Sequence, residues 1–503
     1  MEKSEKFFWA DKVAEDIIKQ RGKKKEFVCA SGISPSGTVH IGNFREIITT
    51  DLVVRALKDK GKKVKFIYSW DDYDRLRKIP ANLPENKQKE FEKFLGLPLS
   101  EAPSPYGDKK SYAEHFEQEF EKALVSVGIK PNFIRQSQRN KKCAYAPLIK
   151  KALDERKKII KILDKYRKEP LEESWMPIEV YCEKCGKDNT RVFSAEGYFI
   201  EYGCSCGFRN KIDFRKKGIV KLKWRIDWPA RWKYEKVDFE PGGNEHSVVG
   251  GSFTTGKEIS KEIYDYEAPM YVMYDFINAK GAEGKMSKSL GNVITLKDVE
   301  EIYEPEIIRY LFVGTRPNKG FDISFDGDVI KIYEDYDELE RKYYEKEADE
   351  QERRIYELSR LKVSKKKPDR ISFRHLTTLI QTGKTSKLKG YAKQRAEKAQ
   401  NWLKKYAPDD FKFELKDKIE TNFTNEQKEA MISLKEILKA RKINEDDLLN
   451  EFYNISNASG ISVKEFFETA YVAIIGKRKG PRLANFIFAI GKDKVIKLLE
   501  QIK

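Results

Sequence analysis

Long apolar runs are missing from this sequence of 503 residues. No run approaches the roughly 18 residues that a membrane-spanning helix requires, charged residues make up 36% of the chain, and the mean hydropathy is −0.68. Residues 1–11 are charged and lack the apolar stretch of a secretory signal. We therefore expect no membrane association and a cytoplasmic location. The 40% hydrophobic and 12% aromatic content excludes a disordered chain, because it can fill several cores.

Cysteine is also scarce, and six cysteines in a chain of this length exclude a disulfide scaffold. Four of them cluster as Cys182-x2-Cys185 and Cys204-x-Cys206, and each pair is followed by glycine. Four thiolates at this spacing favour a tetrahedral zinc site over reduced buried cysteines. Since the four sulfurs leave no open coordination position, we expect a structural zinc and not a catalytic one.

Positive charge is abundant. Lysine and arginine number 99 against 81 aspartates and glutamates, which gives a formal charge of +18. A basic excess of this size indicates a polyanionic partner such as nucleic acid, although a lysine-rich proteome would also produce it. The length exceeds what one hydrophobic core supports, so we expect three or four domains.

The first part of the chain predicts one βαβ unit. Residues 26–30 form a short apolar strand, 31–37 a glycine-containing turn, 40–58 an amphipathic helix and 64–70 a second strand. Strand, glycine-rich turn, helix and strand are typical of an open parallel sheet. A helix at 112–126 and a strand at 132–136 continue the pattern.

The remaining patterns predict the domain order. The sheet is expected to resume after residue 220 and to end around 276–279, so the cysteine segment is an insertion. Strands largely stop after 290, residues 361–368 form a linker or exposed turn, and only helical patterns follow 371. The predicted domains are a doubly wound, Rossmann-type α/β domain in two halves, 1–165 and 223–290, a zinc-binding insertion at 166–222, a connecting helical region at 291–360 and an α-helical domain at 361–503.

The junction of the first strand and helix reads Pro35-Ser36-Gly37-Thr38-Val39-His40-Ile41-Gly42-Asn43. Glycines allow a ligand close to the backbone, and a helix amino-terminus offers unpaired N–H groups with positive potential. His40 and Asn43 are three residues apart and face the same way. This geometry suits a triphosphate, although a glycine-rich turn with one histidine is also an ordinary helix start.

A second motif, about 245 residues downstream, reads Gly284-Lys285-Met286-Ser287-Lys288-Ser289-Leu290-Gly291-Asn292. Two lysines three residues apart can approach a phosphate whose charge grows in a transition state. A lone motif of this kind is also compatible with a solvated loop. The pair of motifs together is improbable by chance.

With these two motifs the chain resembles the class I aminoacyl-tRNA synthetases. Their first signature ends His-Ile-Gly-His, where this chain has Asn43, and their second is Lys-Met-Ser-Lys-Ser, which is intact at 285–289. Residues 69–78, 105–107, 111–116, 224–232 and 476–482 resemble the class I lysyl-tRNA synthetase group. The resemblance extends from about residue 26 to 490.

This resemblance implies a lysine–tRNA ligase, which uses ATP with Mg²⁺ to form lysyl-adenylate and transfers lysine to the 3′ end of tRNA(Lys). It also implies that the carboxy-terminal helices bind the tRNA anticodon. The implied catalytic residues are His40, Asn43, Lys285 and Lys288. The implied ATP-binding residues are Ser34, Gly37, His40, Gly42, Asn43, Gly243, Glu245, Lys285, Ser287 and Lys288. The implied lysine-binding residues are Gly32, Ser34, Trp224, His246 and Tyr274, and the implied metal ligands are Cys182, Cys185, Cys204 and Cys206.

Several alternatives stay open at this point. Asp72, Asp74 and Asp227 are either substrate contacts or ion-paired structural carboxylates, and His375 with residues 384–393 forms either a solvated helix face or an RNA-contacting face. The alternative functions are another class I synthetase, glutamyl or cysteinyl, and a non-catalytic tRNA-binding descendant. A glutamate pocket would require a cationic recogniser, and a cysteine pocket usually a metal in the catalytic site.

Overall fold

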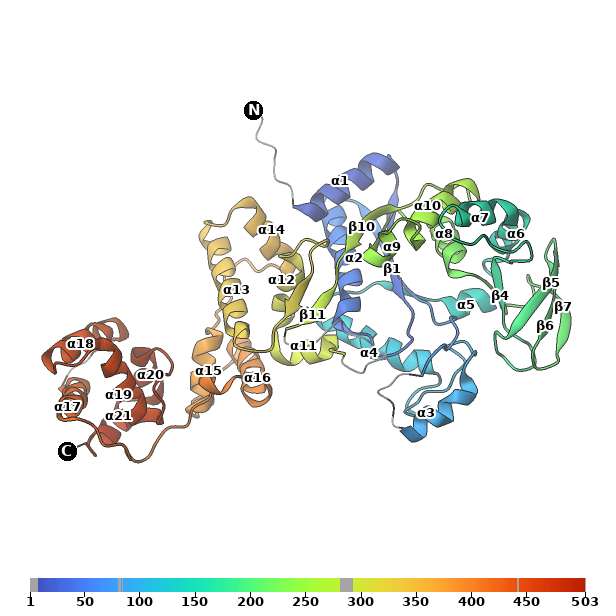
Figure 1. Ribbon diagram of the computed structural model, residues 1–503. Helices are drawn as coiled ribbons and strands as arrows, with labels where there is room; N and C mark the ends of the chain where they lie inside the picture. The colour runs from blue at the N-terminus through green and yellow to red at the C-terminus, as the bar shows by residue number, and fades with distance from the viewer. Residues whose placement is uncertain (1–7, 80–82, 84, 281–292, 441–442, 503) are drawn as a thin grey trace. The chain divides into compact units, whose positions relative to one another are not determined.

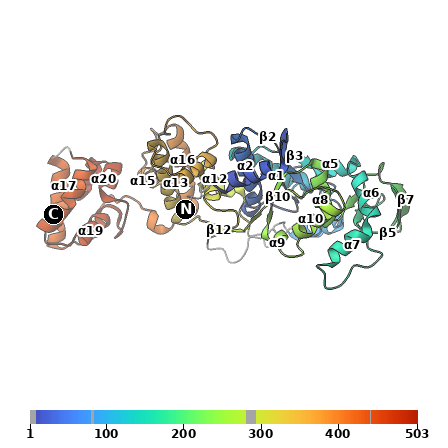
Figure 2. The same ribbon diagram turned by 90° about the horizontal axis from the view of Figure 1, so that it is seen from above.

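A computed structural model describes residues 8–79, 83, 85–280, 293–440 and 443–502 (Figures 1 and 2). The chain folds into two compact units. The first unit comprises residues 1–300, 308–323 and 348–363, and the second comprises 301–307, 324–347 and 364–503.

The first unit is organised around a five-stranded sheet in the order β10-β9-β1-β2-β3. Every neighbouring pair is parallel. From β1 the chain adds β2 and β3 on one side, and β9 and β10 later occupy the other. This confirms the predicted doubly wound fold, and its switch point, where such sheets bind ligands, lies between β1 and β9. The strands are β1 Glu26–Ile33, β2 Lys63–Trp70, β3 Asn132–Arg135, β9 Phe239–Gly243 and β10 Met270–Tyr274.

Helices pack on this sheet where the sequence periodicity places them. The helix α2 (Ile41–Asp59) packs along β1, β2 and β9, and α4 spans Tyr112–Ser126 as predicted. In α8 (Trp224–Glu235), Trp228 and Trp232 are four residues apart and therefore share a face. Their rings pack in one core with Val28, Ala30 and Ile67 of the sheet.

Two strand boundaries differ from the sequence prediction by more than one residue. Strand β1 continues to Ile33 because it pairs with β2 as far as Trp70. The prediction that the main sheet ends around 276–279 is wrong, because β11 (Ile277–Ala279) pairs with β12 (Phe321–Ile323) in a separate two-stranded sheet. The chain leaves the main sheet at Asp275, whose backbone N–H donates to the carbonyl of Pro317 at 2.9 Å.

The cysteine segment forms antiparallel sheets. Strands β4 (Ile178–Val180) and β8 (Val220–Leu222) pair at its base, while β5 (Thr190–Glu196), β6 (Phe199–Cys204) and β7 (Arg209–Asp213) form a three-stranded sheet. Ile200 and Tyr202 of β6 belong to a core shared with α6 (Ala146–Asp154), α7 (Arg156–Asp164) and α10 (Ser252–Glu262). Figure 1 shows this small sheet beside α6 and α7.

The remaining elements beside or between these are mostly short. They are α1 Trp9–Arg21, α3 Glu85–Phe91, η1 Glu92–Phe94, α5 Gln136–Lys141, α9 Asn244–Ser247, α11 Leu296–Ile302, α12 Pro305–Val313 and α14 Glu350–Ser359. Across the described part of the chain, no helix has both the length and the apolar composition needed to cross a membrane.

In the second unit, the regular elements of the described residues are all helical. Arg395 of this unit is buried, and its guanidinium group contacts the carboxylates of Glu304 at 2.9 Å and Asp337 at 2.7 Å. A separate apolar core fills the carboxy-terminal part. The elements are α13 Asp328–Glu345, α15 Phe373–Gln381, α16 Gly390–Lys405, η2 Asp409–Phe411, α17 Asn425–Ala440, α18 Glu445–Ala458, α19 Val463–Ile475, α20 Leu483–Ile490 and α21 Lys492–Leu499.

Candidate active site

Several of the predicted site residues lie at the carboxyl ends of β1 and β9, on the two sides of the switch point. Gly32 is near the end of β1, and Ser34 and Gly37 follow it. Gly243 ends β9, and Glu245 and His246 lie in the short helix α9 that follows immediately. Parallel strands end at the same sheet edge, so the topology brings these two segments together.

His40 is the amino-terminal cap residue of α2. Its backbone N–H donates to the Asn43 side-chain oxygen at 3.3 Å, so the amide oxygen of Asn43 supports the helix start. A Cβ atom on Gly42 would approach the His40 ring to 2.9 Å, which explains glycine at this position. The amino-terminus of an α-helix carries positive potential, which favours an anionic ligand at this end of α2.

The lysine-bearing motif at 284–292, with Lys285, Ser287 and Lys288, lies wholly outside the described residues. The segment that follows them contacts the start of α2, because Ile41 N–H donates to Ile294 O at 2.7 Å and His40 forms a β-bridge with Thr295.

Two predicted lysine-binding residues converge on a carboxylate that the sequence analysis did not name. The Gly32 N–H donates to Glu46 Oε1 at 2.8 Å, and the Tyr274 hydroxyl donates to Glu46 Oε2 at 2.9 Å. Burial raises the pKa of Glu46 to about 8, partly offset by the hydrogen bond from Gly32. A Cβ atom on Gly32 would lie 2.6 Å from the Ser69 carbonyl, so no larger residue fits there.

More carboxylates surround Glu46 than cations. Arg231 Nη1 pairs with Asp71, and its Nε lies 3.2 Å from Asp227. Glu240 accepts a hydrogen bond from Trp232 Nε1 at 2.7 Å, and burial raises its pKa to about 7. Burial likewise raises the pKa of Asp227 to about 6. Asp71 and Asp227 share the Arg231 guanidinium group, and among the described residues neither Glu46 nor Glu240 forms an ion pair, so these surroundings favour a cationic ligand.

An aromatic group stands at the amino-terminal end of α8. The Trp224 and Trp228 rings stack at 5.2 Å with 15° between their planes. The His246 ring lies 5.5 Å from Trp228 and 6.2 Å from Trp224, and burial lowers its pKa. The Trp224 indole N–H donates to Ser252 Oγ at 3.2 Å. These contacts place two predicted lysine-binding residues, Trp224 and His246, beside each other.

The three aspartates whose role the sequence left undecided all have hydrogen-bond or ion-pair partners within the protein. Asp72 accepts hydrogen bonds from the backbone N–H and the hydroxyl of Ser137, which belongs to the first turn of α5. Asp74 pairs with the buried Lys221, and Asp227 pairs with Arg231.

The four predicted metal ligands come together in the insertion. The Cys182 and Cys206 sulfurs are 3.7 Å apart, those of Cys185 and Cys204 are 3.6 Å apart, and all four lie within 4.8 Å of one another. A tetrahedron with metal–sulfur bonds of about 2.3 Å has sulfur–sulfur edges of about 3.8 Å. The four sulfurs therefore fit a tetrahedral metal ion.

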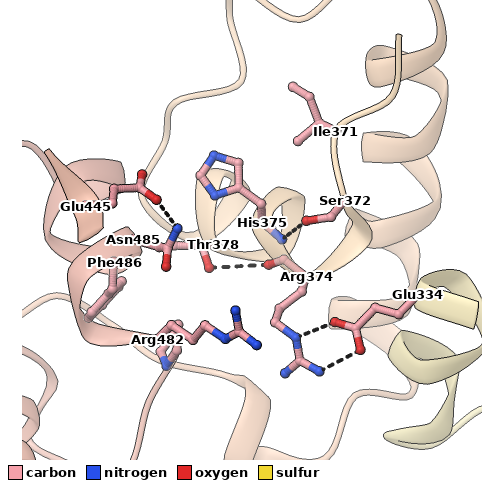
Figure 3. Close-up of a pocket in the computed structure, with 11 residues that line it drawn as sticks. Glu334, Ile371, Ser372, Arg374, His375, Thr378, Glu445, Arg482, Asn485 and Phe486 are labelled. Atoms are coloured by element: carbon pink, nitrogen blue, oxygen red, sulfur yellow. Dashed lines mark hydrogen bonds and ion pairs between the residues drawn. The ribbon is translucent and has the colours of Figure 1, made fainter. Parts of the chain in front are cut away.

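A pocket of about 410 Å³ lies in the second unit between α15 and α20 (Figure 3). His375 of α15 and Arg482, which immediately precedes α20, both line it. Arg374 on its wall pairs with Glu334 of α13 at 2.7 Å. The walls of the pocket thus contain both His375, which the sequence singled out, and the guanidinium group of Arg482, about a hundred residues further along the chain.

The parallel sheet and the His40 helix start at its switch point define a doubly wound α/β domain. Residues 7–362 match the model of the family described as tRNA synthetases class I (K), and residues 390–503 match that of the anticodon binding domain. The chain belongs to this class I tRNA synthetase family.

Relatives over nearly full length carry the name lysine–tRNA ligase. The Borreliella burgdorferi protein is 47% identical over 97% of this chain and 98% of its own length. The Treponema pallidum protein is 44% identical over 98% of each chain. The Pyrococcus horikoshii protein is 40% identical over 98% of this chain and 99% of its own.

Proposed function

We propose that this protein is a cytoplasmic lysine–tRNA ligase, which joins lysine to ATP as lysyl-adenylate, releases pyrophosphate, and passes lysine to the 3′ end of tRNA(Lys). The observation that carries the proposal is the likeness to lysine–tRNA ligases at 40–47% identity over 97–98% of this chain. Residues 1–165 and 223–290 would form the catalytic domain, 166–222 its zinc-binding insertion, 291–360 the connecting region, and 361–503 the anticodon-binding domain.

The proposed ATP site lies at the start of α2. His40, Asn43 and the first-turn N–H groups would hold the triphosphate, together with Ser34, Gly37 and Gly42. Gly243 and Glu245 would face the ribose, and Lys285, Ser287 and Lys288 the α-phosphate. ATP would bind as its Mg²⁺ complex. Catalysis would be positional and electrostatic, without a covalent enzyme intermediate.

The surplus of carboxylates supports lysine over glutamate as the amino acid. Lysine carries two ammonium groups and one carboxylate, so its net charge is complementary to this site, whereas glutamate would be repelled. Arg231, which could attract a carboxylate, already pairs with Asp71 and Asp227. We assign Glu46 to a substrate ammonium group, because Gly32 and Tyr274 orient its two oxygens. Ser34, Trp224 and His246 would complete the pocket.

The proposed metal is a structural zinc ion bound by Cys182, Cys185, Cys204 and Cys206. Sulfur–sulfur distances of 3.6 and 3.7 Å support this assignment. The ion would hold the turn after β4 against the β6–β7 hairpin, and it would bind the thiolate form of each cysteine.

The proposed RNA-reading surface is in the second unit. The pocket between α15 and α20 has His375 and Arg482 on its walls, and α20 lies within the anticodon binding match. Exposed arginines attract phosphates, and an imidazole ring can stack on a base. We therefore assign this pocket to a nucleotide of the anticodon loop.

Aminoacylation of purified tRNA with labelled lysine, glutamate or cysteine tests the proposal. We expect charging with lysine alone, and with tRNA(Lys) far above other tRNAs. Preferential charging with glutamate or cysteine would assign the chain to another specificity. No charging by folded protein with any of the three would favour a non-catalytic RNA-binding protein.

A further inference from the structure

A cavity of about 450 Å³ lies beside the proposed lysine site, within the first unit. Its walls come from the end of α7, from residues 171–179, from the first turn of α8 and from Gly250. Trp224 lines this cavity and also stacks on Trp228, next to His246. The cavity and the proposed lysine site therefore share one side chain as a wall.

The cavity is strongly cationic. Arg77, Arg167, Lys223 and Arg225 line it, and Glu179 is the one acidic lining residue among those described. Within the described residues, Arg77, Lys223 and Arg225 form no ion pair with a carboxylate. Arg225 instead donates to the carbonyl of Gly250 at 2.6 Å. Formal charges of +4 and −1 leave a surplus of +3, which attracts an anionic ligand.

The same walls are aromatic. Trp175 and Trp224 line the cavity with Tyr166, and the Lys223 ammonium group lies 4.9 Å from the Trp175 ring centroid. The loop that leads to Gly250 exposes two apolar side chains, since Val248 is 57% and Val249 89% accessible. A ligand that satisfies such walls carries negative charge and a flat ring, as a nucleotide does.

We infer that this cavity binds an unpaired nucleotide at the 3′ end of the tRNA. The inference rests on the proposed function, because transfer requires the tRNA end to reach lysyl-adenylate, and the cavity shares Trp224 with the proposed lysine site. An unpaired nucleotide exposes the face of its base for stacking, which a base inside a duplex does not.

The test compares two transcripts of tRNA(Lys), one complete and one that lacks the 3′-terminal CCA. Their dissociation constants are measured by filter binding with the full-length protein. We expect the wild type to bind the complete transcript about 5-fold or more tightly, the lower end of what one base stacked on an aromatic ring contributes. Trp175→Ala and Lys223→Gln should bring this ratio close to one, with unchanged affinity for the shortened transcript.

Two variants serve as controls. Trp175→Phe keeps an aromatic face and should retain most of the ratio. Lys157→Gln removes one charge from an exposed position in the first turn of α7, outside the cavity, and should leave the ratio unchanged.

The outcomes separate the inference from the proposed function. If the wild type charges tRNA with lysine but binds both transcripts equally, the inference fails and the proposed function stands. The inference also fails if Trp175→Ala and Lys223→Gln retain the wild-type ratio, or if they weaken both transcripts alike. A raised KM for ATP with an unchanged ratio would assign the cavity to ATP instead. Absence of lysine charging by the wild type would overturn the proposed function itself.

Discussion

Replacing Glu46 by glutamine removes a charge from the site while keeping a side chain of nearly the same shape. The Gly32 N–H can still donate to the new amide oxygen, and the Tyr274 hydroxyl, which donates to the second oxygen of Glu46, can accept from the new NH2 group. If Glu46 faces a substrate ammonium group, the change leaves that group without its counter-charge. Loss of one partner of a buried charge pair costs about 2–4 kcal/mol, which is about a 30- to 1000-fold rise in the KM for lysine.

The pH dependence provides a sharper signature. With a pKa of about 8, the carboxylate of Glu46 is ionised in about 1% of free protein at pH 6 and in half of it at pH 8. Since an ammonium group favours the ionised form, kcat/KM for lysine should rise about 50-fold between these pH values. In Glu46→Gln this rise should be absent.

The same shift predicts a change in stability. The pKa of Glu46 is raised from an ordinary value of 4.5 to about 8, so the unliganded protein takes up a proton when it folds. The stability that this proton contributes is fully present below pH 4.5 and is lost as the pH rises toward 8. Thermal melting from pH 5 to 8.5 should show a smaller decline for Glu46→Gln than for the wild type.

The assay is aminoacylation at saturating ATP and tRNA, with lysine varied from pH 6 to 8.5. Glu117→Gln is the matched control, because burial raises the pKa of Glu117 to about 8 as well, while that side chain pairs with Arg135 at 3.0 Å. It should keep the wild-type lysine KM and profile. A wild-type profile in Glu46→Gln, with an unchanged KM for lysine, would refute the role of Glu46.

Three further predictions address the other assigned groups. Lys288→Ala should lower the rate of lysine activation about 10²- to 10³-fold with little change in the KM for lysine. The reason is that the ammonium group acts on charge that develops in the transition state. Unchanged turnover would contradict this prediction. Cys182→Ser should reduce bound zinc, which metal analysis should find at about one per wild-type chain; fully active protein without metal would contradict the assignment. Arg482→Ala should raise the KM for tRNA and make tRNA binding less dependent on salt. Lys494→Ala, which changes an exposed lysine of α21 outside the pocket, should have neither effect. Equal effects of the two substitutions would show that the pocket does not bind RNA.

Local patterns in the sequence determined much of this protein. The 3.6-residue periodicity predicted α4 at its observed bounds and α2 to within one residue at each end. The spacing of Cys182, Cys185, Cys204 and Cys206 predicted a cluster that the fold confirms as four neighbouring sulfurs. These features are local, because a helix and a tight cysteine turn depend on residues only a few positions apart.

The tertiary structure alone decided which distant residues meet. Glu46 in sequence is one acid on an apolar helix, and only the packing of α2 brings it to Tyr274, 228 residues away. The partners of Asp72 and Asp74 likewise depend on long-range packing, as does the pairing of β11 with β12. Strand pairing and side-chain convergence join segments whose separation carries no periodic signal. The sequence could therefore name the two motifs and Asp227, but not Glu46 or Glu240.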